Sequence, residues 1–526
     1  MEPESRTYDV AIIGGALAGA SAALLLLREK PNLRVLVIEK SDVFGRRVGE
    51  ATVEVSGYFL TRVLGLTQHL NESHLVKQGM RFWFFNENTK SLDQCSEVGG
   101  LSLARLPAFQ VDRSVLDQEV LNRARAVGAE LWRPADVQSV ELKAGGTQKV
   151  HAKVNGELRT AEARWVIDAS GVAALLARRN GWLKPNTEHP TAALWSRWRG
   201  VKDWDGRELA EKFPMWHKAC FGTRATATNH LVGDGWWAWL IPLKGGDTSI
   251  GVVFDQRTVR IPEGGSLGER LKKFLCEHPV GREIMCDAQW LEGDVHWRKN
   301  LPYVTSVFAG DGFALIGDAS AFLDPFYSPG MDWVSFTTIS AVKLIIAQLN
   351  GECIKEQLVR HNFRFARSYD RWFRAIYKDK YDYMGEYDLM RLAFAMDIGL
   401  YYMGVVAQPF RRGTESFLEP VFSTAPANPV YILMRQYNRR LAAMARDRRA
   451  RGMRGKTNLG RRYLVPGFNF GFETGQRVGW AMIDWFRLEL TEGWRTWFAS
   501  PARMQREEAE RGVLNTRATG VDVRAM

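Results

Sequence analysis

The stretch Tyr8-Asp9-Val10-Ala11-Ile12-Ile13-Gly14-Gly15-Ala16-Leu17-Ala18-Gly19 decides the fold of this chain. Its apolar half predicts a buried strand that ends in a tight glycine turn, and the Ala- and Leu-rich run to about Glu29 predicts a helix. A second apolar run, Leu33–Ile38, ends at Glu39, which lies 20 residues after Gly19. Strand, glycine turn, helix, strand and acid in this order are the fingerprint of a dinucleotide-binding sheet.

The glycine turn allows phosphate oxygens to approach the backbone N–H groups at the N-terminus of the helix. Glu39 is placed to accept hydrogen bonds from a ribose. The middle glycine of the fingerprint is replaced by Ala16, whose methyl group we expect to crowd the pyrophosphate slightly. Four small residues are predicted to hold the pyrophosphate: Gly14, Gly15, Ala18 and Gly19.

Three later segments favour FAD over NAD. Trp165-Val166-Ile167-Asp168-Ala169-Ser170-Gly171 and Phe313-Ala314-Leu315-Ile316-Gly317-Asp318-Ala319 each read as a strand that ends in a turn, and Val111-Asp112-Arg113 precedes a predicted helix, Ser114–Val127. They resemble the segments with which flavoprotein monooxygenases of the hydroxylase superfamily surround FAD. The resemblance implies that Gly317 and Asp318 hold ribityl and ribose hydroxyls and that Arg113 lies on the flavin side.

No second strand–glycine–helix fingerprint follows in the sequence, so no dedicated NAD(P)H domain is predicted. Reduced FAD is therefore expected to come from a transient visit of a nicotinamide or from a separate flavin reductase, which would be a protein partner.

Three further segments resemble the flavin-dependent halogenases, and the resemblance covers roughly Tyr8 to Leu349. They are Val48-Gly49-Glu50-Ala51-Thr52, the WxWxIP match Trp237-Ala238-Trp239-Leu240-Ile241-Pro242, and the FxxPxxSxG match Phe322-Leu323-Asp324-Pro325-Phe326-Tyr327-Ser328-Pro329-Gly330. The resemblance implies that Trp237 and Trp239 separate flavin from substrate. It also assigns two further sets of residues: flavin contacts at Glu50, Ala51 and Pro325, and a halide site or tunnel at Ser328 and Gly330.

The resemblance further implies a reaction and a catalytic lysine. Reduced FAD and oxygen give a C4a-hydroperoxide, halide converts it to hypohalous acid, and the acid travels through a tunnel to a lysine beside the substrate. Lys77 occupies that position, 28 residues after Gly49 and five before Phe82. Beside the aromatic-rich strand that follows it, the Lys77 ammonium would lose hydration and its pKa would fall. The alternative interpretation is a surface lysine at the start of a strand.

Two departures from the family pattern affect the predicted function. Tyr327 stands where tryptophan halogenases have a glutamate, which is similar to the members that act on phenols and pyrroles. Pro329 has no N–H, so of the two backbone donors that bind halide in the family only that of Gly330 remains. We therefore predict a two-component halogenase-like enzyme for an electron-rich aromatic or pyrrole, free or bound to an acyl carrier protein. The alternative is an FAD-dependent aromatic hydroxylase that has lost halide binding.

Composition fits a globular enzyme, with 46% hydrophobic and 25% charged residues. The five scattered cysteines form no CxxC pair, which argues against a disulfide framework and against a metal site. Met1–Arg6 is short and polar, so no signal peptide and a cytoplasmic location are expected. The apolar run Leu392–Val406 contains Asp397 and is shorter than a bilayer span, which predicts a buried helix.

The expected fold class is α/β: a Rossmann-type FAD-binding domain interleaved with a β-sheet substrate domain, plus a mainly helical C-terminal region. Residues 1–350 would form the FAD-binding module, with the substrate sheet inserted at about 76–110 and 180–300. Residues 351–526 would be helical, cover the substrate side and fray at Thr516–Met526.

The C-terminal region 351–526 holds 30 Lys and Arg against 19 Asp and Glu, which is nearly all of the net charge of +12. Eight arginines lie between Arg435 and Arg454, against the single acid Asp447. This run is open to three interpretations: a solvated helical face, a contact for an acidic partner such as a carrier protein, or a peripheral contact with an anionic membrane. Nucleic acid is not expected, because no recognition motif accompanies the charge.

Overall fold

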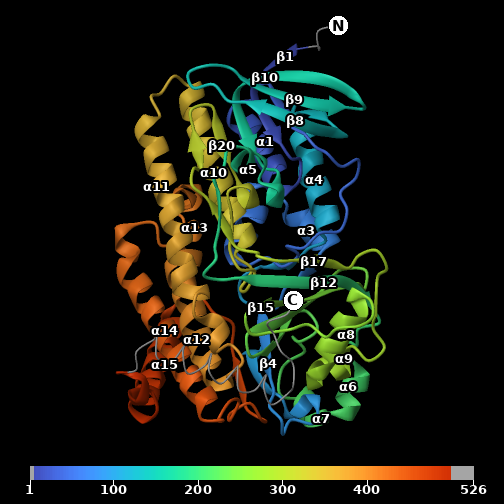
Figure 1. Cartoon of the computed structure of the whole chain (residues 1–526), viewed down its shortest axis with the longest axis vertical. Coiled ribbons are helices and arrows are strands. Elements are labelled where there is room, and N and C mark those ends of the chain that lie inside the picture. The colour runs from blue at the N-terminus through green and yellow to red at the C-terminus, as the bar shows by residue number, and fades with distance from the viewer. Residues whose placement is uncertain (1–4, 499–526) are drawn as a thin grey trace, which may run out of the picture.

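The predicted first strand lies inside a mostly parallel sheet of eight strands. In the computed structural model, which describes residues 5–498 (Figure 1), this sheet forms the upper part of the molecule. The stretch Thr516–Met526 lies outside the described residues. The main path of the sheet is β19 (Ala309–Gly310), β20 (Phe313–Leu315), β10 (Glu157–Asp168), β1 (Ser5–Ile13), β2 (Val35–Ile38) and β7 (Glu130–Trp132).

The strand register brings the predicted cofactor segments to one edge of this sheet. β1 runs parallel to both of its neighbours, and Ile13 pairs with Asp168 of β10 and with Ile38 of β2. Asp168 in turn pairs with Leu315 of β20. Because parallel strands end at the same edge, the turns after β1, β2, β10 and β20 meet there, which is where α/β sheets bind ligands. The Rossmann-type fold is thus confirmed.

A second sheet of nine strands forms the lower part of the molecule in Figure 1. It contains β4 (Met80–Phe84), β5 (Ser96–Gly100), β12 (Thr191–Arg199), β13 (Thr228–Gly233), β14 (Trp236–Pro242), β15 (Thr248–Asp255), β16 (Gln289–Trp290), β17 (His296–Arg298) and β22 (Arg462–Val465). Most of these strands come from the two predicted insertions. β22 comes instead from the C-terminal region and pairs in parallel with β5. The C-terminal region therefore also extends this sheet, and the division into 1–350 and 351–526 stays a prediction.

Long helices of the C-terminal region stand beside both sheets, on the left of Figure 1: α11 (Lys355–Trp372), α12 (Tyr387–Tyr401), α14 (Asn428–Ala450) and α15 (Phe472–Thr491). Beside the first sheet, α1 (Leu17–Glu29) packs against α4 (Arg113–Ala126) and α10 (Gly330–Leu349). The shorter helices are α2 (Glu54–Tyr58), α3 (Thr67–Ser73), α5 (Leu175–Arg179), α6 (Arg207–Lys212), α7 (Pro214–His217), α8 (Leu267–Glu277), α9 (Pro279–Ile284) and α13 (Ala407–Arg412). The remaining strands are β3 (Leu75–Val76), β6 (Phe109–Gln110), β8 (Ala135–Glu141), β9 (Gln148–Val154), β11 (Leu183–Pro185), β18 (Tyr303–Thr305) and β21 (Ala321–Phe322).

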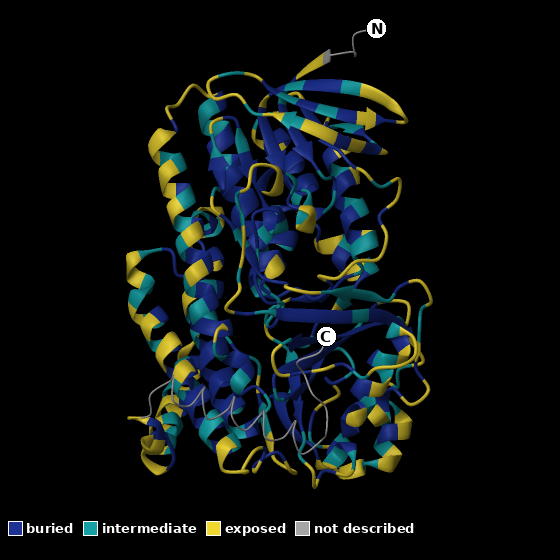
Figure 2. Ribbon diagram, in the orientation of Figure 1, coloured by how far each residue is buried: buried dark blue, intermediate teal, exposed yellow. Residues whose placement is uncertain are grey.

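Two helical stretches, Gly330–Leu349 and Tyr387–Leu418, are long and apolar enough to cross a bilayer by length and composition alone. Most of each stretch is buried inside the protein, 72% of the first and 67% of the second over the most apolar window. Figure 2 shows the same burial as dark blue on these helices. This agrees with the prediction that Leu392–Val406 belongs to a buried helix.

Ion pairs within the protein use most of the positive charge of the arginine-rich run. Six of its eight arginines lie within ion-pair distance of a carboxylate: Arg440, Arg446, Arg448, Arg449, Arg451 and Arg454. Arg435 and Arg439 are exposed, and no described carboxylate lies within ion-pair distance of either. Most arginines of this run therefore form ion pairs inside the protein and are not free to bind an acidic partner.

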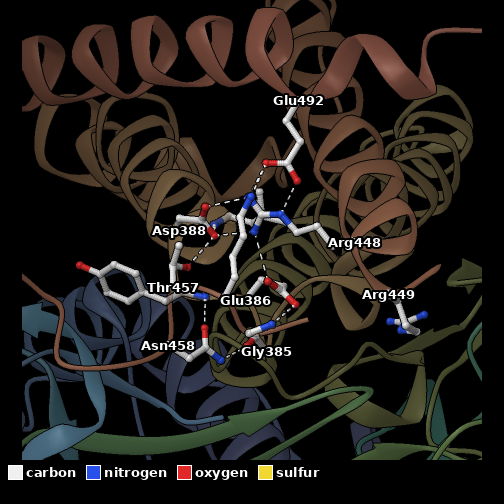
Figure 3. A network of polar contacts seen from close by, with 12 residues as sticks. Gly385, Glu386, Asp388, Arg448, Arg449, Thr457, Asn458 and Glu492 are labelled. Atoms are coloured by element: carbon white, nitrogen blue, oxygen red, sulfur yellow. Dashed lines mark hydrogen bonds and ion pairs between the residues drawn. The ribbon is translucent and has the colours of Figure 1, made fainter. Parts of the chain in front are cut away.

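Arg448 is the centre of this charge network (Figure 3). Its side chain is fully buried, and three carboxylates surround it. Arg448 donates to Glu492 at 2.6 and 2.9 Å, to Asp388 at 2.7 and 2.8 Å, and to Glu386 at 3.1 Å. Burial works to raise the pKa of Glu492, but hydrogen bonds from Arg448 and Lys456 lower it to about 2. The network ties α14, the start of α12 and the segment after α15 into one body.

Candidate active site

The glycine turn after β1 is too tightly packed for side chains. Gly14 has a φ of +100°, and a Cβ there would lie 2.4 Å from the carbonyl oxygen of Ala169 at the end of β10. A Cβ on Gly19 would lie 1.9 Å from the carbonyl oxygen of Gly14. α1 starts at Leu17, so its unpaired N–H groups open towards the turn. This geometry fits the pyrophosphate of a dinucleotide.

Glu39 lies directly beside the turn, as its spacing predicts. Its Oε2 accepts a hydrogen bond of 2.7 Å from the N–H of Gly15, and its Oε1 accepts one of 2.9 Å from Ser41. The carboxylate is thereby fixed at the edge where a ribose would lie. Its role as the ribose acceptor stays a prediction.

Replacing Gly14 with valine is expected to abolish flavin retention. The sequence predicts that a side chain at Gly14 would clash with the pyrophosphate. The structure shows that it would also clash with the carbonyl group of Ala169, and that the positive φ disfavours valine. Flavin absorbance of the purified variant measures the effect. The matched control is Gly45→Val, since Gly45 is exposed and a Cβ there meets nothing within 4 Å. Wild-type absorbance in the Gly14 variant would show that the turn does not bind the cofactor.

Charged groups meet on the predicted flavin side. Arg113 begins α4 and donates to the carbonyl of Val48 at 3.3 Å, next to Gly49. Glu50 is buried and accepts hydrogen bonds of 2.7 and 3.1 Å from Arg197 of β12. Burial raises the pKa of Glu50 to about 7, against the positive charge of Arg197. Sequence reasoning did not find Arg197, because no motif surrounds it.

Asp318 follows β20 and completes this side of the site. Burial raises the pKa of its carboxyl to about 6, against the positive charges of Arg113 and Arg298. The preceding Gly317 has a φ of +57°, and a Cβ there would lie 3.4 Å from the Cβ of Ala18. Two segments predicted to hold FAD are therefore in close contact, although 299 positions separate them.

Asp324 anchors the loop that carries the FxxPxxSxG match. Its Oδ1 accepts a hydrogen bond of 2.9 Å from the N–H of Phe326, and its Oδ2 accepts one of 2.7 Å from Tyr381. The Tyr381 hydroxyl in turn accepts a hydrogen bond of 2.8 Å from the indole of Trp237. The loop and the WxWxIP strand β14 are thereby held in fixed relation. In the same strand, Trp239 donates to Ser249 at 3.1 Å.

The end of this loop has unusual backbone geometry. Tyr327 and Ser328 have φ values of +67° and +57°, which non-glycine residues rarely adopt. Ser328 donates to the carbonyl of Pro325 at 2.9 Å, and Pro329 caps α10, which begins at Gly330. Two successive strained residues commonly mark a functional loop.

A cavity of about 630 Å³ lies beside this loop, and Tyr327 and Pro329 are part of its wall. Its walls extend from Thr52 and Pro329 to α12 and α14 of the C-terminal region, and they are mostly apolar. We call it the chamber. A volume of this size is typical of a small-molecule site.

Lys77 forms part of the chamber wall and is only 2% exposed, which excludes a surface lysine. Its Nζ donates to the carbonyl of Thr52 at 2.9 Å. Burial lowers the pKa of Lys77 to about 8, against the negative charges of Glu54 and Asp332. The amine is thus available in both protonation states near neutral pH.

Asp332, in the first turn of α10, also lines the chamber. It accepts hydrogen bonds of 2.9 Å from the N–H of Ser56 and 2.8 Å from the hydroxyl of Tyr401. Burial raises the pKa of Asp332 to about 7, against these hydrogen bonds. Sequence reasoning missed it, although an acid two residues after Gly330 in an otherwise apolar helix was a usable signal.

Comparisons with known proteins agree with this geometry. A family model described as FAD dependent oxidoreductase matches residues 9–220. A flavin-dependent halogenase of Dictyostelium discoideum is 28% identical over 70% of this chain, a match that spans 63% of the relative's own length. The chlorinase of 1H-pyrrole-2-carbonyl-[peptidyl-carrier protein] from Pseudomonas fluorescens is 26% identical over 70% of this chain and 82% of its own.

Among solved structures, halogenase PltM in complex with phloroglucinol and FAD is similar, with a TM-score of 0.70 at 19% identity over 91% of this chain and 96% of the other. The chain is similar to flavin-dependent halogenases over about 70% of its length. It is an FAD-dependent oxidoreductase, and FAD is its cofactor.

The residues of the three segments predicted to surround FAD, and Glu50 and Ala51 of the predicted flavin turn, do not line the chamber. Lys77 lines it together with Tyr327 and Pro329 of the loop 322–330. The five cysteines are free. Within residues 5–498 no group of three or more His, Cys, Asp and Glu could hold a metal ion.

Tyr327 lies where tryptophan halogenases have a glutamate, and it too lines the chamber. Its hydroxyl donates to Asp397 at 3.2 Å, and Asp397 also accepts a hydrogen bond of 2.6 Å from the buried Lys380. The only acid in the apolar run Leu392–Val406 is therefore part of an ion pair. The ion pair of Asp397 and Lys380, both in the C-terminal region, holds the hydroxyl of Tyr327 in place.

Proposed function

We propose that this enzyme halogenates an electron-rich aromatic or pyrrole substrate in the chamber, with reduced FAD supplied by a separate flavin reductase. The observation that carries the proposal is Lys77, a buried lysine with a lowered pKa in the wall of an apolar chamber. Reduced FAD, when bound, would activate molecular oxygen, which is the oxidant that converts halide to hypohalous acid. In this proposal the loop 322–330 and Trp237 would separate the cofactor from the chamber, so the oxidant would act at a distance.

The relatives support this substrate class. The Pseudomonas relative is named for a pyrrole group on a peptidyl carrier protein, and PltM was solved with phloroglucinol, a phenol. Both rings are electron-rich. The chamber is apolar and large enough for a free aromatic molecule or for the end of a tethered one.

Lys77 and Asp332 of the chamber wall have distinct roles in this proposal. The Nζ of Lys77 holds the oxidant by a hydrogen bond and directs its halogen to the ring. The carbon–halogen bond then forms as the halogen–oxygen bond breaks, and the departing hydroxide takes a proton from Lys77 and leaves as water. The carbon–hydrogen bond breaks, and the ring proton passes to the carboxylate of Asp332. Trp237 and Trp239 exclude the substrate from the flavin, which blocks direct oxygen transfer.

The product mass tests the proposal. The protein is incubated with a generic flavin reductase, FAD, NADH and candidate phenols in bromide, chloride or halide-free buffer. The proposal predicts that the product gains a halogen and that none forms without halide. A gain of one oxygen whether or not halide is present would instead identify the alternative function, an FAD-dependent aromatic hydroxylase on the same scaffold. The observation that favours the alternative is Pro329.

Replacing Pro329 with threonine is expected to strengthen halide binding. Pro329 lacks the N–H that would donate to an anion beside Gly330, and its φ of −74° suits threonine. One N–H to a partly buried anion contributes about 1.5–3 kcal/mol, which is roughly ten- to a hundred-fold in affinity. The bromide concentration at half-maximal rate should fall by this factor. Pro329→Ala should match it because the N–H, and not the hydroxyl, causes the effect. An unchanged halide dependence in both variants would place the halide elsewhere.

The pH profile tests the role of Asp332. A carboxylate base must be ionised, so turnover of the wild type should rise with pH through about 7, the raised pKa of Asp332. Asp332→Asn should lose this rise and slow turnover by about 10²- to 10⁴-fold, the usual contribution of a general base. Glu54→Gln is the matched control, because Glu54 also lines the chamber and accepts a hydrogen bond of 2.6 Å from Tyr402. If Asp332→Asn kept the wild-type profile, the proton would go elsewhere.

A further inference from the structure

The outer face of α15 and of the turn that follows it is strongly apolar. Single exposed apolar residues are normal on soluble proteins, but a continuous run of them on one segment is not. We call this surface the outer face. It comprises Phe472, Trp480, Met482, Ile483, Phe486, Leu490, Trp494, Trp497 and Phe498, which are between 36% and 96% exposed.

Helix periodicity places the members of the outer face that belong to α15 on one half of that helix. At 100° per residue, Phe472, Ile483 and Leu490 point within about 20° of one another. The buried residues Val478 and Ala481 point the other way, and Val478 packs against Gly399 of α12. The helix is thus apolar on two opposite sides, and only one of them is used inside the described part of the chain.

The acidic residues of this segment form ion pairs with arginines elsewhere in the protein. Glu473 pairs with Arg105, Asp484 with Arg391, Glu489 with Arg440 and Glu492 with Arg448. Figure 3 shows Glu492 directed towards the buried Arg448. The four carboxylates are therefore compensated within the fold.

Two cations remain on the exposed side of the same segment. Arg487 is exposed and reaches only the shared Asp484, at 3.5 Å, and Arg495 is exposed and lies over the ring of Trp494. The outer face thus combines nine large apolar side chains with positive charge. This is the pattern of a helix that lies in the interface of an anionic membrane, where tryptophan and arginine are preferred.

We propose that the outer face docks this enzyme on the surface of an anionic lipid bilayer. Six of its nine apolar side chains are aromatic, which favours the headgroup region over an acidic carrier protein, since such a partner would call for more than two cations. The segment just before α15, Val465–Phe468, lines the chamber. Docking would therefore bring the chamber close to lipophilic phenols dissolved in the bilayer. This docking does not depend on the halogenation reaction.

Vesicle partitioning of the full chain tests the proposal. Vesicles of phosphatidylcholine with phosphatidylglycerol should bind the protein more tightly than vesicles of phosphatidylcholine alone. The triple variant Trp480→Ser, Phe486→Ser and Leu490→Ser should partition at least about a hundred-fold more weakly, because each side chain contributes at least 1 kcal/mol on burial. All three are exposed, so the variant should keep its flavin absorbance. The control is Val359→Ser with Phe363→Ser on α11, which are 71% and 58% exposed and lie outside the outer face.

Three results would overturn the proposal. The first is a wild-type chain that stays in solution with both kinds of vesicle. In the second, sedimentation equilibrium finds a dimer that the triple variant converts to a monomer, which would make the outer face a contact between two copies. In the third, only a chain that ends at Phe498 binds vesicles, which would mean that residues 499–526 cover the face in the full protein.

Discussion

Replacing Lys77 with alanine is expected to abolish halogenated product while flavin oxidation continues and hydrogen peroxide accumulates. The oxidant is made at the flavin, so its formation does not need the lysine, but its transfer to the ring does. The loss should be on the order of 10²- to 10⁴-fold, the range for a positioned acid or hydrogen-bond donor. Product mass, oxygen uptake and peroxide are measured together.

Two control variants separate the lysine from the shape of the chamber. Met434→Leu changes another residue of the chamber wall at nearly constant volume and should keep most of the activity. Lys77→Arg keeps the positive charge but loses the titration near pH 8 and the compact ammonium group, so it should recover little product. Full product formation by Lys77→Ala would refute the proposed role of the lysine, and the WxWxIP match would then be inherited architecture alone.

Replacing Arg448 with methionine is expected to lower the free energy of unfolding by about 3–5 kcal/mol, the usual cost when one partner of a buried ion network is removed. Methionine is close in size to the arginine stem, so the effect comes from leaving Glu386, Asp388 and Glu492 without their shared partner (Figure 3). Chemical unfolding followed by tryptophan fluorescence measures it.

The surface pair of Arg454 and Asp234 provides the matched control for Arg448. The side chain of Arg454 is 53% exposed and lies 3.3 Å from Asp234, so Arg454→Met should cost less than about 1 kcal/mol. The folded-state pKa of Glu492 lies below its ordinary value of 4.5, so its stabilisation is present above pH 4.5 and is lost as the pH falls towards 2. The deficit of the Arg448 variant should shrink over that range. Equal deficits in the two variants would show that the network does not stabilise the fold.

The cofactor half of the molecule could be predicted from the sequence because its signals are local. The strand, turn and helix around Gly14 and the acid Glu39 each have a short pattern, and the parallel register then brings the later turns to the same edge. The burial of Lys77 also followed from the aromatic strand after it.

The residues that sequence reasoning missed act through contacts between distant segments. Arg197 lies 147 residues from Glu50, and no sequence motif around either residue predicts the contact between them. The proposed role of Asp332 becomes visible only in the structure. There, hydrogen bonds from Ser56 and Tyr401 hold its carboxylate in the chamber wall that also contains Lys77. The contribution of β22 to the second sheet was missed for the same reason, since β5 lies more than 350 positions away.

Isotope labelling of the product tests the central claim most directly. The wild-type enzyme is supplied with reduced FAD, a phenol, bromide and heavy-isotope molecular oxygen, and the product mass is read from single turnovers. If the oxidant is hypohalous acid acting at Lys77, the product carries bromine and no heavy oxygen, and no product forms when bromide is left out. A product that carries one heavy oxygen atom, in the same amount with and without bromide, would contradict the account.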